Sequence, residues 1–277
     1  MVISQYFVEF ILYSFLGWIW ECTYVSFRTG HWDNRGFLHG PVCPIYGTGA
    51  VLASICFGSF HILGSSSSPI WQVFLISAAA SFVLEYSTSW LLEKRFHAVW
   101  WDYSDMPLNI HGRVCLPATL AFGIAGVLIV RFVIPVAEEV KSFIPPLLSE
   151  AGALFFMALL SSDLVLTVQS LTDLAAKLDA AEKEFNDTME ARYRRVDYEK
   201  QLITASVKGA GMAARDRLNS LSESLSSRQQ YALRTVHHFS ATRRDLVAGR
   251  LKEALLSGKE RITREISRYH NDSTGNE

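Results

Sequence analysis

Lysine and arginine are scarce in the first part of the chain: residues 1–173 hold seven of the 26, and residues 174–277 hold the other 19. All seven tryptophans lie in the first part. This part also contains uncharged apolar runs near the ~20-residue length that crosses a hydrocarbon core. The net charge of −1 for the whole chain hides this division. The contrast predicts a transmembrane domain over residues 1–172, followed by a charged, soluble tail.

Motifs for nucleotide and peptide hydrolysis are absent as well. The chain has no GxxxxGK[ST] phosphate loop, no GxSxG nucleophile elbow and no HExxH zinc motif. If ATP drives this protein, another chain must therefore hydrolyse it. The four cysteines, two inside apolar runs and two at their borders, form no disulfide framework. No cofactor is expected, and no pattern indicates nucleic-acid recognition.

Five apolar runs are predicted to cross the membrane as helices, at about 6–27, 45–63, 69–93, 114–134 and 147–171. No basic stretch precedes the first run and Glu9 interrupts it, so it is not a cleavable signal peptide. The positive-inside rule places basic loops in the cytoplasm. Basic residues follow the first and third runs, whereas the N-terminus and the loop after the second run have none. This pattern predicts an all-α protein of the cell membrane, with its N-terminus outside and its tail in the cytoplasm.

Two copies of one pattern follow each other in the membrane region. HGPVC (39–43) and HGRVC (111–115) align without a gap, and the same offset aligns Glu21 with Glu93 in the shared pattern F-x-L-x5-W-x-x-E-x17-H-G-x-V-C. Two hairpins with the same interfacial preferences would explain the tryptophan, but not the glutamate and HGxVC in one register. A duplication into parallel repeats is therefore predicted, and such repeats commonly enclose a substrate path. The predicted repeats cover about 6–63 and 69–134, with the fifth span beside them.

Charged residues inside predicted spans are costly in lipid and therefore indicate function. Glu21 and Glu93 lie near the cytoplasmic ends of the first and third runs, and Glu85 lies about two helical turns deeper than Glu93, on the same helix face. Arg35 and Arg113, in the following loops, are the expected partners. A solvated, interfacial position is the alternative for Glu21 and Glu93. Glu85 has apolar neighbours, so a buried position is favoured.

Asp163 interrupts the fifth apolar run, FFMALLSSDLVL. We expect it to pair with a polar group of the repeat core, or to lie with Ser161 and Ser162 beside a water-filled cavity. Either position would give a charge in the span a specific role.

The loops 33–49 (DNRGFLHGPVCPIYGTG) and 100–117 (WWDYSDMPLNIHGRVCLP) combine helix breakers with large apolar side chains. Solvated loops do not need so many apolar groups. We expect these loops to fold back into the bundle as irregular or re-entrant segments, where backbone groups can bind substrate or ions. The alternative is an aromatic belt at the headgroup level, which explains Trp100 and Trp101 better than Asp102.

Four residues of the two HGxVC segments could in principle hold a metal ion. His39, Cys43, His111 and Cys115 make a Cys2His2 set, which zinc binds tetrahedrally. However, H-x3-C is not a usual spacing for structural zinc, and a free cysteine is often only a small apolar residue. The metal site is therefore the weaker interpretation, and none is predicted.

These loops also resemble a known family. GWIWE (17–21), NRGFLHGPVCPIYGTG (34–49), the pair Leu92–Glu93 and WWDYSDMPLNIHGRVCL (100–116) are similar to motifs of bacterial integral membrane proteins described as putative ABC-transporter permeases, type IV. The resemblance covers about residues 4–170. The matching positions are Trp18, Glu21, Asn34, Arg35, Gly36, Gly40, Pro41, Pro44, Tyr46, Gly47, Glu93, Trp101, Asp102, Tyr103, Ser104, Asn109, Gly112, Arg113 and Cys115.

The resemblance implies a multi-span protein of bacterial type in the plasma membrane, with a separate cytosolic ATPase as a partner. His39 and His111 are not among the matching positions, which weakens the metal interpretation further.

From Leu171 onward, apolar residues recur in steps of three and four between charged faces, which predicts amphipathic helices or an antiparallel coiled coil over 173–268. GAGM (209–212) is the expected break, and 269–277 is expected to be disordered. The 19 basic and 15 acidic residues of 174–277 permit contact with anionic lipid, although homo-oligomerisation or docking of a cytosolic partner is favoured. The apolar positions are Leu171, Leu174, Leu178, Ala181, Phe185, Leu218, Leu221, Leu225, Val247, Leu251, Leu255, Ile262 and Ile266.

Three functions are compatible with these features. The leading hypothesis is a transporter or permease-like subunit with its path between the two repeats. A membrane-embedded enzyme acting on a lipid or small hydrophobic substrate would use Asp102, His111 and Glu93 for acid–base chemistry, and a non-catalytic scaffold would act through its tail. The candidates for lining the path are Glu21, Arg35, Glu85, Glu93, Asp102, Tyr103, Asn109, Arg113 and Asp163.

Overall fold

The computed structural model describes residues 2–30, 32, 34–59, 65, 67–196, 216–239, 245–253 and 255–256, and most of these residues are helical. The chain divides into two compact units, residues 1–169 and 170–277. Helix α6 (Pro146–Val196) contributes to both. An all-α protein was predicted, and in the described residues the strands are limited to two short ones, β1 (Ala98–Val99) and β2 (His238–Phe239).

Four helical segments are long and apolar enough to span a membrane, so the protein is a multi-pass membrane protein. They run over Val2–Phe27 in α1 (Val2–Thr29), over α3 (Ile70–Phe96), over Leu116–Phe143 and over Pro146–Glu184 in α6. The predicted second span (45–63) corresponds to a shorter apolar helix, Pro44–Gly58, and residues 60–64 lie outside the described residues. The expected number of five spans is therefore not confirmed.

The helices that follow the two HGxVC segments begin alike. Helix α2 (Pro44–Ala53) starts after an extended Cys43, and α4 (Leu116–Leu128) starts at the equivalent position of the second copy, after an extended Cys115. Both have proline in the first two positions, where a missing N–H costs no helical hydrogen bond. Both also continue into a π-helix, which is a rare element. These π-helices are η1 (Ser54–Ser59) after α2 and η2 (Ile129–Val133) after α4.

Each of these helices packs against the helix that precedes it in the chain: α1 against α2, and α3 against α4. Glycines allow the close approach. A Cβ on Gly47 would collide with the Phe10 carbonyl oxygen and the Ser14 hydroxyl, and one on Gly126 would collide with Ser77. Small residues at helix contacts are typical of membrane bundles, where packing rather than hydrophobicity drives association.

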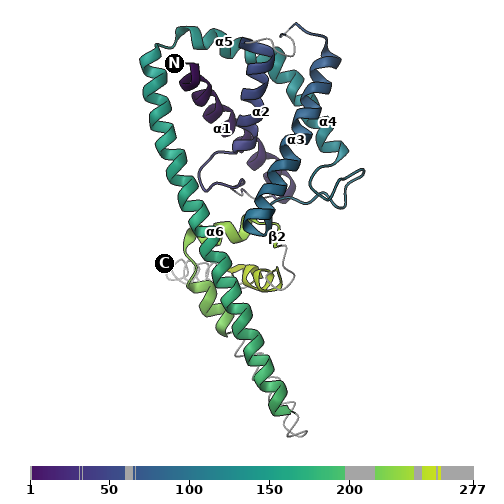
Figure 1. The fold of residues 1–277 in the computed structure, drawn as a ribbon, viewed down its shortest axis with the longest axis vertical. Helices are drawn as coiled ribbons and strands as arrows, with labels where there is room; N and C mark the ends of the chain where they lie inside the picture. The colour runs from purple at the N-terminus through teal and green to yellow at the C-terminus, as the bar shows by residue number, and fades with distance from the viewer. Residues whose placement is uncertain are drawn as a thin grey trace, which may run out of the picture. The chain divides into compact units, whose positions relative to one another are not determined.

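The two halves meet at the end of the unit that holds the π-helices. A buried cluster of Phe57, Val73, Val130 and Ile134 joins η1, α3, η2 and α5 (Ile134–Phe143). Helix α5 begins with Pro135 in its first turn. Figure 1 shows α5 and the N-terminus at one end of the helices, and the loops after α1 and α3 at the other end.

The second unit has a small core of its own. Leu171, Leu174 and Leu178 form a buried stripe on α6, and Leu225 and Leu251 are buried as well. Helix α8 (Ser227–Thr235) starts with a capping box between Ser226 and Gln229. The Lys177 ammonium ties α6 to this helix, since it donates to Gln229 Oε1 and to the Ser224 carbonyl, both at 2.9 Å.

Residues 216–223 and 245–253 of this unit are also helical. A coiled coil is not confirmed for the tail. The expected break at 209–212 and the expected disorder at 269–277 lie outside the described residues, as do Ile262 and Ile266 and the side chain of Phe185.

Candidate functional site

Helix α1 presents its polar side chains to the interior and its apolar ones to the outside. Glu9, Tyr13 and Ser14 are buried, whereas Leu12 and Leu16 are exposed. In a membrane-spanning segment the outward face meets lipid, so the polar groups must find partners within the protein. A span with this inverted pattern is expected to line a polar interior.

The loop end of the unit brings two carboxylates and two tyrosines together. The Tyr46 hydroxyl donates a hydrogen bond to Glu21 Oε1, and the Tyr103 side chain is hydrogen-bonded to Glu85. Glu85 is only 5% exposed, and its Oε2 atom makes no hydrogen bond. The two carboxylates are close enough to interact electrostatically, although Glu21 is on α1 and Glu85 on α3. Two carboxyl groups from different helices therefore lie near each other in the interior of the loop end.

Local structure places the two tyrosines. Tyr46 lies in the first turn of α2, and Gly17 on α1 makes room for its ring, because a Cβ there would collide with the Tyr46 side chain. Tyr103 is held by its backbone, whose N–H donates to the Gly112 carbonyl at 2.8 Å. Burial, together with the charges of Glu85 and Glu21, raises the pKa of the Tyr103 hydroxyl. Tyr103 therefore keeps its proton and acts as a hydrogen-bond donor to Glu85.

Glu93 forms an ion pair with Arg113, the partner expected from the sequence. Arg113 Nη2 lies 2.6 Å from Glu93 Oε2, and Nη1 donates to the Tyr86 hydroxyl at 3.3 Å. The hydrogen bond to Glu93 raises the pKa of the Arg113 guanidinium. His111 Nδ1 lies 3.2 Å from the same Tyr86 hydroxyl, so Tyr86, which the sequence did not single out, joins α3 to the second loop.

The expected pairing of Glu21 with Arg35 is wrong: Glu21 is bonded to Tyr46 instead. The Arg35 Nε atom is buried and makes no hydrogen bond, while the Arg35 carbonyl accepts from the Cys43 thiol at 3.8 Å. The offset that aligns the two HGxVC segments places Arg113 opposite Pro41, and not opposite Arg35. The two arginines are therefore not equivalent in register.

Contacts with distant helices hold the first loop. Trp18 Nε1 donates to Asn34 Oδ1 at 2.5 Å, and the Asn34 amide donates to the His39 carbonyl at 3.0 Å. The Gly40 N–H donates to Asp163 Oδ2 of α6 at 2.9 Å. Asp163 thus accepts a hydrogen bond from a backbone group of the first loop. The Ser162 hydroxyl donates to the Ala158 carbonyl of its own helix at 2.7 Å.

Mostly internal bonds hold the second loop. Asp102 Oδ1 accepts from the Ser104 N–H at 2.9 Å and from the Ser104 hydroxyl at 2.5 Å. The Asn109 amide donates to the carbonyls of Ser104 and Met106, and Asn109 Oδ1 accepts from the Gly112 N–H. Trp101 Nε1 donates to the Arg113 carbonyl at 3.0 Å. Asp102 is exposed at the surface of this loop and does not reach the interior beside Glu85.

The two cysteines of the HGxVC segments are buried where α2 and α4 begin. Burial, followed by the charge of Glu21, raises the pKa of the Cys43 thiol to about 12. Cys43 therefore remains a neutral thiol near neutral pH, whereas zinc binds thiolate. The surroundings of Cys43 thus disfavour the Cys2His2 alternative.

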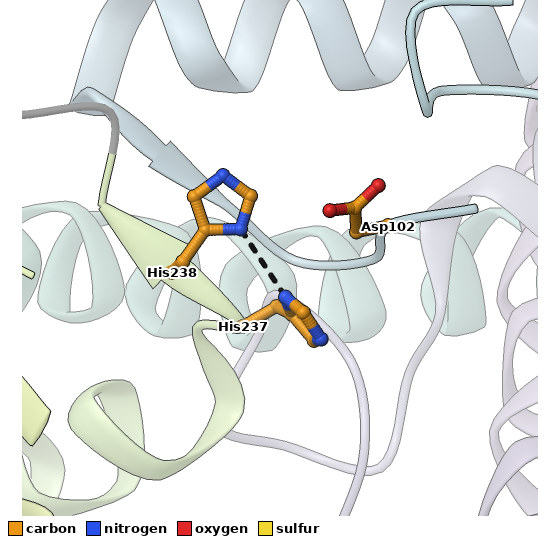
Figure 2. A group of neighbouring side chains, drawn as sticks. All are labelled: Asp102, His237 and His238. Carbon is orange, nitrogen blue, oxygen red and sulfur yellow. Dashed lines mark hydrogen bonds between the residues drawn. The ribbon is translucent and has the colours of Figure 1, made fainter. Parts of the chain in front are cut away.

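The second unit contains a pair of histidines that the sequence analysis did not single out. His237 and His238 are consecutive, and their Nδ1 atoms lie 3.2 Å apart. Figure 2 shows the two rings and the hydrogen bond between them. One ring must donate and the other accept for this bond to form, so at most one of the two Nδ1 atoms carries the bonding proton.

Comparison with known proteins assigns the membrane unit to a family. Residues 8–168 match the family model described as "Putative ABC-transporter type IV". The matched range contains every loop and carboxylate described above for the first unit. No match was found among curated proteins or among solved structures.

Proposed function

Because the chain belongs to the "Putative ABC-transporter type IV" family, whose model covers more than half of it, we propose that it is a permease-like subunit with its path between the two halves of the membrane unit. The loop end of the unit is then the cytoplasmic end, the N-terminus lies outside and the tail lies in the cytoplasm of a bacterial-type cell. A separate cytosolic ATPase supplies the energy, because this chain lacks a phosphate-binding loop.

The observation that carries this proposal is the buried carboxylate of Glu85 opposite Glu21. A charge at this depth in a span is expensive unless a function retains it. Neither carboxylate pairs with a lysine or arginine among the described residues; each has a tyrosine hydroxyl instead. A positively charged group of a solute would offset both carboxylates. We therefore expect the transported solute to be a cation or to carry an ammonium group.

The arrangement of the helices supports two parallel repeats. Helices α2 and α4 begin in the same register after equivalent cysteines, both have an early proline and both lead into a π-helix. Each packs on the helix before it. A duplicated helix pair explains all of these correspondences at once, and the Glu21 and Glu85 carboxylates come from different repeats.

The test is charge movement in proteoliposomes. The full chain is reconstituted with the ATPase from its own gene neighbourhood and exposed in turn to K⁺, choline, a diamine and an amino acid, while currents are recorded on a solid-supported membrane. We expect at least one cation to give a current that Glu85→Gln and Arg113→Ala abolish, although both variants still insert into the membrane. Asp105→Asn, which alters an exposed acid of the second loop, is the matched control and should transport normally. Wild-type currents in Glu85→Gln would contradict the proposal.

The compact second unit favours one other candidate, a scaffold that acts through its tail. It has its own buried leucines and its own helix contacts. Deleting residues 174–277 separates the two functions. Currents that persist without the tail support the path, whereas loss of function with an intact, inserted membrane unit supports the scaffold.

An enzymatic role has less support. Glu93 forms an ion pair with Arg113, and Asp102 accepts a hydrogen bond from Ser104. Neither carboxylate is therefore available as a general acid or base. Mass spectrometry of the lipids incubated with the full chain tests this role, since new lipid products would favour the enzyme.

A further inference from the structure

A second buried group of charges lies at the end of the membrane unit opposite the loops. Lys141 Nζ on α5 lies 2.7 Å from Glu9 Oε1 on α1 and 2.7 Å from Glu138 Oε1 on its own helix. The ring of Tyr6 lies 5.1 Å from the same ammonium. Figure 1 places α5 near the N-terminal end of α1, at the end of the unit away from the loops that follow α1 and α3.

Three buried oxygens beside this ion pair lack partners. Glu9 is 6% exposed and its Oε2 makes no hydrogen bond. The hydroxyls of Tyr13 and Ser54 approach each other, and Tyr13 is also within electrostatic reach of Glu9 and Lys141, yet neither hydroxyl makes a hydrogen bond of normal geometry. Ser54 is 1% exposed. Buried polar atoms without partners are rare in folded proteins, and each one calls for an explanation such as a bound ion or water.

The backbone around Ser54 fits the same interpretation. Ser54 is the first residue of η1, and π-helical turns shift carbonyl groups out of the regular helical pattern. Such turns occur often at functional sites. The carboxylate oxygen of Glu9 and the hydroxyl oxygens of Tyr13 and Ser54 are hard oxygen ligands, which alkali and alkaline-earth cations prefer.

The charge of the group selects a monovalent cation. Ca²⁺ sites are usually built from several carboxylates, whereas Glu9 is the only carboxylate among these three ligands. The Lys141 ammonium already neutralises it. Glu138 is 38% exposed and lies three residues before Lys141 on the same helix, so it can keep the ammonium when Glu9 releases it. An incoming cation of charge +1 would then replace the ammonium at Glu9 without leaving either carboxylate unpaired.

We propose that Glu9, Tyr13 and Ser54 form a binding site for an alkali cation, and that the Lys141 ammonium is the internal competitor for this site. In the lysine-bound state, Lys141 bridges α1 and α5. In the cation-bound state, the cation takes Glu9, Lys141 remains with Glu138, and the link between α1 and α5 opens. A role for this cation in driving solute through the path rests on the proposed transport function, whereas the binding itself does not.

The first test measures binding on the purified full chain in detergent. NaCl replaces choline chloride at constant ionic strength while the thermal unfolding temperature is recorded, and KCl and LiCl are run in parallel. A ligand that binds only the folded state raises this temperature in a saturable way. We expect such a rise with at least one alkali cation in the wild type, no rise in Glu9→Gln, and a weaker response in Ser54→Ala and Tyr13→Phe. Glu139→Gln, which changes an exposed acid next to Glu138, should respond like the wild type.

The second test changes the competitor. Lys141→Met removes the ammonium, so the cation no longer has to displace it, and the half-saturating concentration should fall about tenfold or more. A purely structural ion pair predicts the opposite pattern: Lys141→Met would be less stable in every salt, with no dependence on the alkali cation. Equal unfolding temperatures in choline and in all three alkali salts, in both wild type and Lys141→Met, would overturn the proposal.

The two proposals can fail separately. Saturable binding that depends on Glu9, together with no currents in proteoliposomes, would retain the cation site and reject transport. Currents that depend on Glu85, together with no alkali-cation effect on stability, would retain transport and reject the cation site.

Discussion

The loops that precede α2 and α4 contain nearly the same five residues, HGPVC and HGRVC, but they are held in place by different means. The first loop is bonded to Trp18 of α1 and, through Gly40, to Asp163 of α6. The second loop has internal bonds through Asp102 and Asn109, and Arg113 and His111 bond it to α3. A similar sequence thus gives a similar start to α2 and α4, while the surroundings decide what stabilises each loop. Both loops therefore combine internal bonds with tertiary contacts, but the first is bonded to α1 and α6, whereas the second is bonded to α3.

We expect the largest difference between the two loops when the Asp163 carboxylate is removed. In Asp163→Ala the Gly40 N–H loses a charged acceptor, a bond worth about 1.5–3 kcal/mol. We expect a lower unfolding temperature and faster hydrogen exchange in residues 34–43, with unchanged exchange in residues 100–115.

Asp105→Ala is the control, because Asp105 is an exposed acid of the second loop. Faster exchange in both loops of Asp163→Ala would show that they are not held independently.

Gly112→Ala should affect the second loop alone, with a smaller effect on stability. Gly112 has a φ of +66°, which favours glycine. An added Cβ would also collide with Asp102 Oδ1 and approach the Ser104 hydroxyl. Strain of this kind costs about 1–3 kcal/mol, part of which the exposed Asp102 side chain can relieve by moving.

Hydrogen exchange measures the effect on each loop. In Gly112→Ala we expect faster amide exchange in residues 100–115 and unchanged exchange in residues 34–43. Gly30→Ala, at a glycine with a φ of +75° and open space around it, controls for backbone strain without the collision. An unchanged second loop in Gly112→Ala would show that its internal bonds do not depend on this conformation.

The smallest effect concerns thiol chemistry and leaves stability unchanged. Burial holds the pKa of Cys43 at about 12, above its ordinary value, so the reactive thiolate is a very small fraction below pH 9. N-ethylmaleimide should therefore label Cys43 slowly in the folded protein, with a rate that rises steadily towards pH 10.

A Cys115→Ser, Cys22→Ser, Cys56→Ser background isolates this residue, and unfolded protein gives the reference rate. Fast labelling of Cys43 at pH 7 would mean that the first loop opens far more readily than its contacts imply.

Several features could be predicted from the sequence because they depend on neighbouring residues. Membrane spans can be predicted from apolar runs by composition alone. Four of the five expected spans correspond to long apolar helices. Arg113 could be named as the partner of Glu93 because it lies in the loop that directly follows α3. The family could be named from the loop motifs, and the family model matches residues 8–168.

The polar partners could not be predicted in the same way. Tyr103 and Glu85 lie on different elements, and Gly40 and Asp163 are far apart in the chain. The sequence marked Glu9 only as an interruption of the first span, and it gave no indication of a role for Lys141. The ion pair between them depends on where α5 lies, which hydropathy does not describe.

Hydropathy along the chain predicted four of the long apolar helices, and early prolines mark where α2 and α4 begin, because both signals act within a few residues of the chain. Only the tertiary structure decided which buried carboxylate meets which partner. The reason is energetic: a carboxylate in a low-dielectric interior must be paired or hydrogen-bonded, and the available donor is whichever group packing brings to it. Glu21 accepts a hydrogen bond from Tyr46, Glu85 accepts one from Tyr103, and Glu9 forms an ion pair with Lys141.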